Sequence, residues 1–314
     1  MSDAYTIRPF VDADLPEVLE VMRLSLGESE VNRRTDDLFG WKHFDNPFGR
    51  SIILIADAGG RIAGLRAFMR WELTTPSGQL VRAVRPVDTA THPDFRRMGI
   101  FRNLTMAALE EARADGVHLV FNTPNADSGA GYRSMGWKDV QPIGAFVRPK
   151  RPWRSAVEAT TDRAAFLPEA EKPLGLDTPD RPARGLRTIR SAAYRKWRFA
   201  DHPTAGYRMV RHADGAVMLR PNVRNGRAEV VVSDLVGRAT ARAFRAAAGA
   251  ADSHYLVSWF SGGSPERAAS TSALFVPVPK LTALTQVALP LADLDMDVFD
   301  PKSWDLATGD LELL

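Results

Sequence analysis

The first half of the chain alternates between the hydrophobic spacing of helices and that of strands. Apolar residues recur at three- and four-residue intervals from Leu15 to Met22, which predicts a helix over residues 12–25. A longer helix is predicted over residues 99–114, with Gly116 just beyond its end. Such alternation of helices and strands is typical of an α/β fold.

Strands are predicted at residues 5–9, 51–57, 61–74, 80–91 and 117–123, with a final strand pair between Trp137 and Arg148 and short helices at 36–44 and 126–135. The turn at Ala58-Gly59-Gly60 joins two of these strands as a hairpin. The run Val117–Thr123 is almost continuously apolar, as expected of a strand that is buried on both faces. The predicted unit is therefore a mixed α/β sheet with an antiparallel first part.

The second half repeats this succession. Trp41–Pro47 and Trp197–Pro203 share Trp, a basic residue, Asp and Pro in the same register, and each segment precedes a predicted hairpin. A fixed repeat of elements indicates duplication. We expect two related units, at residues 1–150 and 185–314, joined by a Pro- and Arg-rich linker at 151–184.

Composition excludes several classes of chemistry. The 314 residues contain no cysteine, so disulfides and thiolate sites are absent, and the six histidines do not have metal-ligand spacing. The net charge of +3 is too small and too dispersed to indicate a nucleic-acid partner. Neither a signal peptide nor a membrane-spanning stretch is predicted, which favours a cytoplasmic protein.

A candidate anion site lies between the strand that ends near Thr91 and the helix that follows it. Arg96, Arg97 and Gly99 precede the first helical turn, whose backbone N–H groups have no partner within the helix. Gly99 has no Cβ and allows a phosphate to come close to the backbone. Taken alone, this pattern fits a pyrophosphate site and a solvated helix cap equally well.

The element order and two motifs resemble the GNAT acetyltransferase superfamily. Arg96 and Gly99 match the family's Gln/Arg-x-x-Gly-x-Gly/Ala motif, although Phe101 replaces the small residue at its end. Asn125, Ala126, Tyr132 and Gly136 match a second motif, in which Trp137 stands for the family's Phe. The resemblance covers residues 5–148 strongly and 185–314 as a degenerate copy, which implies a tandem GNAT fold.

The resemblance also implies acetyl-CoA, or another acyl-CoA, as co-substrate without a metal. Backbone groups of the loop would hold the CoA pyrophosphate, the strand before it would pair with the pantetheine arm, and Asn125 would contact the same arm. The implied cofactor residues are Thr89, Ala90, Thr91, Arg96, Arg97, Met98, Gly99, Ile100, Phe101, Arg102 and Asn125. Tyr132 would protonate the departing CoA thiolate, unless it is simply a core tyrosine.

The general base is less well defined. Asp88 and Glu72 lie on the predicted central strands, and either could instead be a structural carboxylate. In the second unit, Asp234 stands where the first unit has paired arginines, and an acid at a helix start would repel pyrophosphate. We therefore expect one active site, in the first unit.

The function that this reading favours is N-acetylation of a primary amine on a small molecule or amino sugar, by a monomer or a homodimer. A mycothiol-synthase-like acetyltransferase is an alternative, although in those enzymes the C-terminal copy is catalytic. A binding or scaffold protein that keeps the fold without turnover is another alternative, because a fold does not fix a function.

Overall fold

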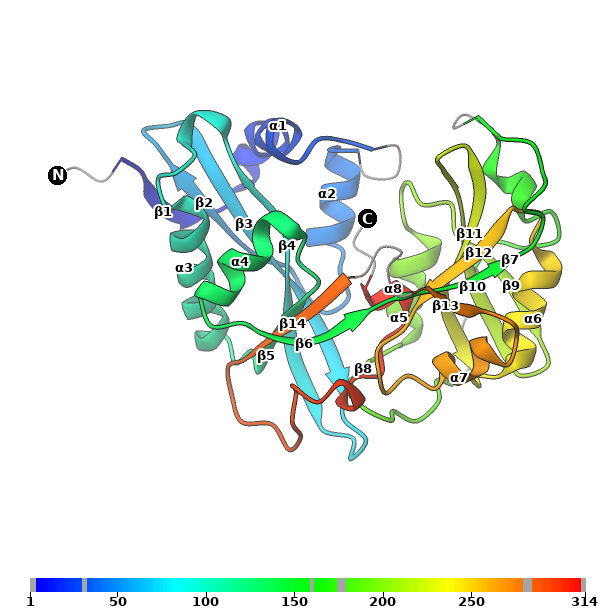
Figure 1. Ribbon diagram of the computed structural model, residues 1–314. Coiled ribbons are helices and arrows are strands. Elements are labelled where there is room, and N and C mark those ends of the chain that lie inside the picture. Colours follow the sequence, from blue (N-terminus) through cyan, green and yellow to red (C-terminus); the bar gives the residue numbers. More distant parts are fainter. Residues whose placement is uncertain (1–3, 30–32, 159–160, 174–178, 279–283, 312–314) are drawn as a thin grey trace.

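The computed structural model describes residues 4–29, 33–158, 161–173, 179–278 and 284–311. Two mixed sheets lie side by side, and helices cover their faces (Figure 1). This confirms the mixed α/β fold class that the sequence predicts.

The first sheet has the order β1-β2-β3-β4-β5-β14-β6, and the short β8 also pairs with β3. Its strands are β1 (Thr6–Pro9), β2 (Ile52–Asp57), β3 (Ile62–Thr74), β4 (Leu80–Thr91), β5 (Leu119–Asn122), β6 (Lys138–Ile143), β8 (Arg187–Thr188) and β14 (Leu284–Pro290). Strands β2, β3 and β4 are antiparallel, whereas β4 and β5 run parallel. These are the pairings that the predicted hairpin and the buried apolar run require.

The helices that cover this sheet in the described part of the chain are α1 (Leu15–Leu26), α2 (Asp36–His43), α3 (Ile100–Ala114) and α4 (Ala126–Ser134). Alternate residues of a strand point to opposite faces. Ile53 and Ile55 pack in the core that contains α1 and α2, whereas Ile52 and Leu54 pack in the core that contains α3 and Tyr132 of α4. The continuous apolar sequence of β2 follows from burial on both sides.

The second sheet has the order β9-β10-β11-β12-β7-β13. Its elements are β7 (Ala145–Pro149), β9 (Arg208–His212), β10 (Gly215–Arg224), β11 (Arg227–Gly237), β12 (Tyr255–Trp259) and β13 (Val276–Val278), with helices α5 (Ala192–Arg195), α6 (Ala241–Ala250), α7 (Glu266–Thr271) and α8 (Thr308–Leu311) in the same half of the chain. Strands β9, β10 and β11 are antiparallel and β11 is parallel to β12, so the pairing of β2 to β5 is repeated.

Each sheet includes strands from the other half of the chain, and the first sheet contains both β8 and β14 from the C-terminal half. Strand β14 comes from the C-terminal half and lies between β5 and β6, while β7 comes from the N-terminal half and lies between β12 and β13. The predicted strand pair between Trp137 and Arg148 is therefore wrong, because β6 and β7 belong to different sheets. A division of the chain at residue 150 does not separate the sheets, and the unit boundaries stay a prediction.

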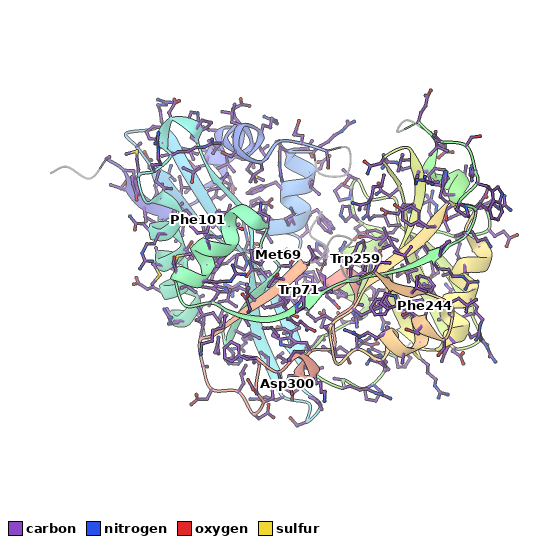
Figure 2. The ribbon with its side chains drawn as sticks, in the orientation of Figure 1. Met69, Trp71, Phe101, Phe244, Trp259 and Asp300 are labelled. Carbon is purple, nitrogen blue, oxygen red and sulfur yellow. The ribbon has the colours of Figure 1, made fainter. Side chains whose placement is uncertain are left out.

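The repeated tryptophans meet at the junction of the units. The rings of Trp41 and Trp197 are stacked with their centroids 4.8 Å apart. Each indole N–H donates to the other residue's backbone carbonyl, at 2.8 and 2.7 Å. Figure 2 shows Trp71 in this central region, where its ring contacts Trp197 edge-on. One buried core thus joins both units.

Residues 151–184, expected as a linker, include a single turn of 310 helix at Arg163–Phe166. Phe166 is fully buried in the second unit's core, and Glu171 forms an isolated bridge with Met209. Residues 159–160 and 174–178 of this segment lie outside the described part of the chain. The described remainder packs on the second unit.

Candidate active site

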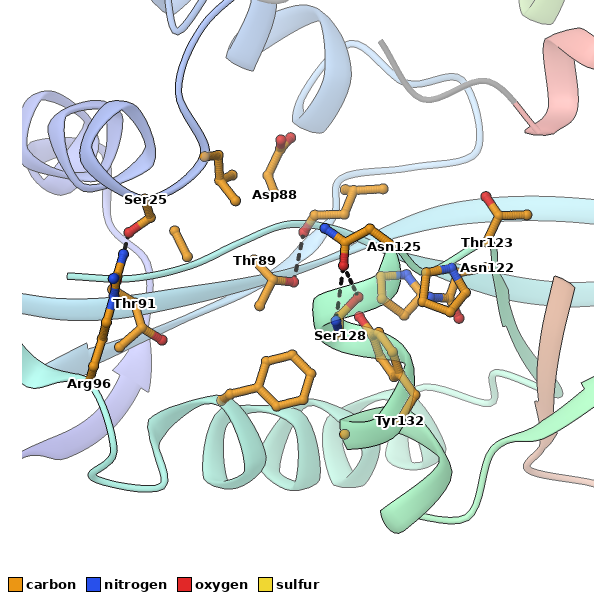
Figure 3. A pocket seen from close by; sticks show the side chains of 17 residues that line it. Ser25, Asp88, Thr89, Thr91, Arg96, Asn122, Thr123, Asn125, Ser128 and Tyr132 are labelled. Atoms are coloured by element: carbon orange, nitrogen blue, oxygen red, sulfur yellow. Dashed lines mark hydrogen bonds between the residues drawn. The ribbon is translucent and has the colours of Figure 1, made fainter. Parts of the chain in front are cut away.

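A cleft opens where the parallel strands β4 and β5 separate. Their pairing is limited to Ala83–Leu119 and Val84–Val120, and beyond it a cleft of about 660 Å³ lies between residues 86–91 of β4 and residues 122–132 (Figure 3). A bulge at Asp88–Thr89, where the register with β3 shifts and Asp88 has a φ of 44°, turns the edge of β4 locally. The edge of β4 that faces β5 can therefore accept an extended ligand as an added strand.

The loop before α3 forms the outer end of the cleft. Arg97 and Gly99 both have left-handed backbone conformations, with φ of 65° and 76°. Gly99 is the N-cap of α3 and no side chain caps the helix, so the described hydrogen bonds leave the N–H groups of residues 97–102 without an acceptor. A second hollow of about 360 Å³ lies over this loop and shares Arg96 and Phe101 with the cleft. The arrangement is suited to a phosphate group.

The structure explains the departure at Phe101 from the family pattern. A Cβ built at Gly131 would lie 2.8 Å from the Phe101 ring, so the phenyl group fills space that the missing side chain on α4 leaves. The same ring contacts Tyr132 edge-on, with centroids 5.5 Å apart. The large residue on α3 and the glycine on α4 compensate each other, and the backbone of the loop keeps its open amides.

Tyr132 and Asn125 lie on the α4 wall of the cleft. Asn125 caps α4, and its Oδ1 accepts from the backbone N–H and the hydroxyl of Ser128, which leaves the amide N–H₂ for the cleft (Figure 3). Tyr132 is 3% exposed, and its hydroxyl accepts a 2.7 Å hydrogen bond from Arg66 Nη1. An oxygen that accepts from a cation directs its own hydrogen elsewhere.

Asp88 lies at the inner end of the cleft among cations. Its carboxylate accepts from Lys42 Nζ at 2.8 Å, from Arg34 at 3.1 Å and from His43 Nε2 at 3.1 Å. Burial disfavours ionisation of Asp88, but the charges of Lys42 and Arg34 and the hydrogen bond from His43 outweigh it and hold the pKa well below its ordinary value. Burial also lowers the pKa of His43, so its ring is neutral at pH 7. The role of Asp88 as general base stays a prediction. The three contacts argue against that role, because they disfavour protonation of the carboxylate.

Replacing Asp88 tests whether the carboxylate is an anchor or a base. We expect Asp88→Asn to lower the free energy of unfolding by about 3 to 5 kcal/mol, the general cost of removing one member of a buried ion cluster. The depressed pKa adds stability that is present above about pH 4 and is lost as the pH falls below it, so the difference from wild type should shrink in acid. Urea denaturation at pH 7 and pH 3 measures both effects.

The matched control is Asp139→Asn, which removes an exposed ion pair with Arg133 and should cost less than about 1 kcal/mol. A large loss of turnover in Asp88→Asn with unchanged stability would instead identify a base.

Most residues expected from the sequence line the two hollows. Those in the cleft or over the loop are Asp88, Thr89, Ala90, Thr91, Arg96, Arg97, Gly99, Ile100, Phe101, Arg102, Asn125 and Tyr132. Met98 is not among the lining residues, and its side chain is exposed. Glu72 is also outside the lining, on β3 opposite Arg82 and next to the residues that pair with β8.

Sequence reasoning missed several residues of the site. Arg66 of β3 is fully buried beneath the cleft, and its only signal was an arginine among the apolar residues 62–69 of the strand. Lys42 and His43 are part of the repeated tryptophan segment, whose basic positions gave no hint of a carboxylate partner. Asn122 of β5 is buried at the lining, and its Oδ1 has no hydrogen-bond partner among the described residues.

The second unit differs at the equivalent places. Asp234 was expected at a helix start, but it is buried within β11. Its Oδ2 lies 2.7 Å from Nε of Arg190. Helix α6 begins later, and the Thr240 hydroxyl caps it by accepting from Ala243 N–H. The explanation based on repulsion by Asp234 is therefore wrong.

The chain itself fills the gap between β11 and β12. Thr308 Oγ1 accepts from Trp259 N–H at 2.8 Å and donates to the Trp259 carbonyl, just beyond the last parallel pair of these strands. Gly309 packs against the Ser233 carbonyl of β11. The position that forms the cleft in the first unit is thus occupied in the second by α8.

A known family matches the part of the chain that contains the cleft. Residues 6–140 match the family model described as an acetyltransferase (GNAT) domain. No curated protein matches the sequence. None of the described helices is long and apolar enough to cross a bilayer, and the described side chains contain no cluster of potential metal ligands.

Solved structures with a similar fold cover most of the chain. A GCN5-related N-acetyltransferase from Kribbella flavida is 17% identical with a TM-score of 0.60, over 90% of this chain and 71% of that one. Eis1 from Mycobacterium abscessus is 18% identical with a TM-score of 0.51, over 81% of this chain and 64% of that one. A putative acetyltransferase from Pyrococcus horikoshii is 14% identical with a TM-score of 0.55, over 99% and 96%. The match identifies residues 6–140, which contain the cleft and both motifs, as an acetyltransferase (GNAT) domain, and the chain shares its fold with solved structures described as N-acetyltransferases.

Proposed function

We propose that the chain transfers an acetyl group from acetyl-CoA to a primary amine of a small molecule or amino sugar. The observation that carries the proposal is the continuity of the cleft. It joins the open amides before α3, the free edge of β4 and the Tyr132 hydroxyl in one path. A long ligand with an anionic end and amide groups along its arm fits this order of partners.

In this proposal, the N–H groups of residues 97–102 bind the CoA pyrophosphate, and the side chains of Arg96 and Arg102 add positive charge. The backbone of Thr89–Thr91 pairs with the amides of the pantetheine arm, and the Asn125 amide donates to the same arm. The thioester then lies between the β4 bulge and Tyr132.

The acceptor amine attacks the thioester carbonyl carbon, and a tetrahedral intermediate forms. Backbone N–H groups at the bulge stabilise its oxyanion. The carbon–sulfur bond breaks, and the Tyr132 hydroxyl protonates the departing thiolate, while the amine's proton passes to solvent and the phenol is reprotonated. Asp88 remains ionised and anchors Lys42, Arg34 and His43 behind the bulge.

A single site per chain follows from the same geometry. The first unit has the open cleft and the uncapped α3, whereas α8 occupies the matching gap of the second unit. We therefore propose that the second unit has a structural role and shapes the acceptor side. A cytoplasmic location, the absence of metal and nucleic-acid partners, and a monomeric or homodimeric state remain predictions.

The test combines binding with turnover. Calorimetric titration with acetyl-CoA should give one site per chain, and saturating acetyl-CoA should raise Tm, since a ligand that binds the native state stabilises it. Thiol release is then measured against a panel of amines that includes amino sugars and the amine of a thiol precursor. If acetyl-CoA binds but no amine in the panel causes thiol release, the scaffold alternative is favoured. If acetyl-CoA does not bind, the proposal is refuted.

A further inference from the structure

Arg66 is a buried cation beneath the cleft. Its side chain is fully buried in β3, and among the residues that the structure describes no carboxylate lies within ion-pair distance of it. Its Nε has no hydrogen-bond partner within the described part of the chain. A buried charge is costly unless it is compensated, so an arginine kept in this position indicates a role beyond packing.

Three hydroxyl groups from three elements surround the guanidinium. Nη1 donates to Thr89 Oγ1 at 2.6 Å and to the Tyr132 hydroxyl at 2.7 Å, and Nη2 donates to Thr105 Oγ1. These residues belong to the β4 bulge, α4 and α3. One planar group therefore ties both walls of the cleft to the sheet and fixes the distance between them.

Aromatic faces complete the surroundings. The Arg66 Cζ lies 4.8 Å from the Phe101 ring centroid and 5.4 Å from that of Tyr132. Cation–π contacts of this kind are strongest where water is excluded. These contacts hold the Arg66 charge beneath the Tyr132 hydroxyl. A carboxylate in the same place would neutralise that charge, whereas the aromatic rings do not.

We propose that Arg66 is the positioning residue for Tyr132, an inference that rests on the proposed acetyl transfer. Because the phenol oxygen accepts from Nη1, its hydrogen points away from Arg66 and toward the cleft, where the thiolate departs. When that proton leaves, the guanidinium stabilises the negative charge on the phenol oxygen. Since the charge arises only during the reaction, the contact contributes to kcat more than to binding.

The sharpest test is a double-mutant cycle with Arg66→Met and Tyr132→Phe, on the full-length chain. We expect Arg66→Met to lower kcat about tenfold when Tyr132 is present and less than about threefold when Tyr132 has been replaced by phenylalanine, because coupled residues are non-additive. The KM for acetyl-CoA should change less than about threefold. Arg66→Lys, which keeps the charge on a single nitrogen, should recover part of kcat.

The matched control is Arg85→Met. Arg85 is also fully buried on the first sheet and contacts aromatic rings, but it donates to the backbone carbonyl of Asp310 outside the cleft. Its effect on kcat should be the same in the wild-type and the Tyr132→Phe backgrounds, whatever its effect on Tm.

The outcomes separate this inference from the function on which it rests. Equal effects of Arg66→Met in both backgrounds would overturn the positioning role, even with acetyl transfer intact. If Tyr132→Phe alone kept full turnover, the proposed acid would be wrong and the positioning role would be overturned with it. Loss of acetyl-CoA affinity in Arg66→Met at normal Tm would mean that Arg66 serves binding instead.

Discussion

Replacing Tyr132 by phenylalanine should lower kcat about a hundredfold while the KM for acetyl-CoA stays nearly constant, because general-acid catalysis contributes on that order. The phenyl ring keeps its contacts with Phe101 and Trp137, so only the hydroxyl is lost. Steady-state thiol release at saturating acetyl-CoA and amine measures the effect, and thermal unfolding verifies that the variant is folded.

A control for this variant is the loss of a tyrosine hydroxyl elsewhere. Tyr255→Phe removes a hydroxyl that donates to Glu229 Oε2 at 2.8 Å in the second unit, away from the lining of the cleft. Its turnover should equal that of the wild type. If Tyr132→Phe were also fully active, Tyr132 would be the core tyrosine that the sequence left as an alternative.

The Gly99→Glu substitution is expected to weaken acetyl-CoA binding by at least about a hundredfold. Two physical effects act together: the residue has a φ of 76°, which side chains rarely adopt, and a carboxylate at the start of α3 repels the pyrophosphate. Gly99→Ala should show the conformational effect alone, so it should bind acetyl-CoA more tightly than Gly99→Glu and retain most of the affinity that is lost through the added carboxylate. Calorimetric titration of both variants separates the two effects.

Gly59→Glu is the matched control, because Gly59 has a φ of 68° in the hairpin between β2 and β3 and no heavy atom lies near its missing Cβ. It should bind acetyl-CoA as tightly as the wild type. Unchanged affinity in Gly99→Glu would contradict the assignment of the loop.

Local signals predicted the elements of the fold well. Helix α3 begins one residue after Gly99, and β4 spans the expected residues 80–91. These positions depend on hydrophobic period, glycine and capping, all of which act within a few residues along the chain. The exchange of β7 and β14 between the sheets had no such signal, because either strand would satisfy either sheet's pattern.

For the site, motif spacing brought the loop before α3 and the α4 wall together correctly. It did not reveal that Asp88 is surrounded by cations, since Arg34 and Lys42 are about 50 residues away in sequence. Nor did it show that Phe101 is accommodated by Gly131, a contact between a side chain of α3 and the backbone of α4. Pairings of this kind depend on packing geometry that no single segment encodes.

By itself, the sequence determined the order of elements, the two motifs and the repeat, because periodicity, glycine conformation and helix-end chemistry are local properties. The tertiary structure decided which strands share a sheet, that Arg66 lies beneath Tyr132, and that α8 occupies the gap of the second unit. Those outcomes come from burying many side chains at once, where shape and charge from distant segments must fit together.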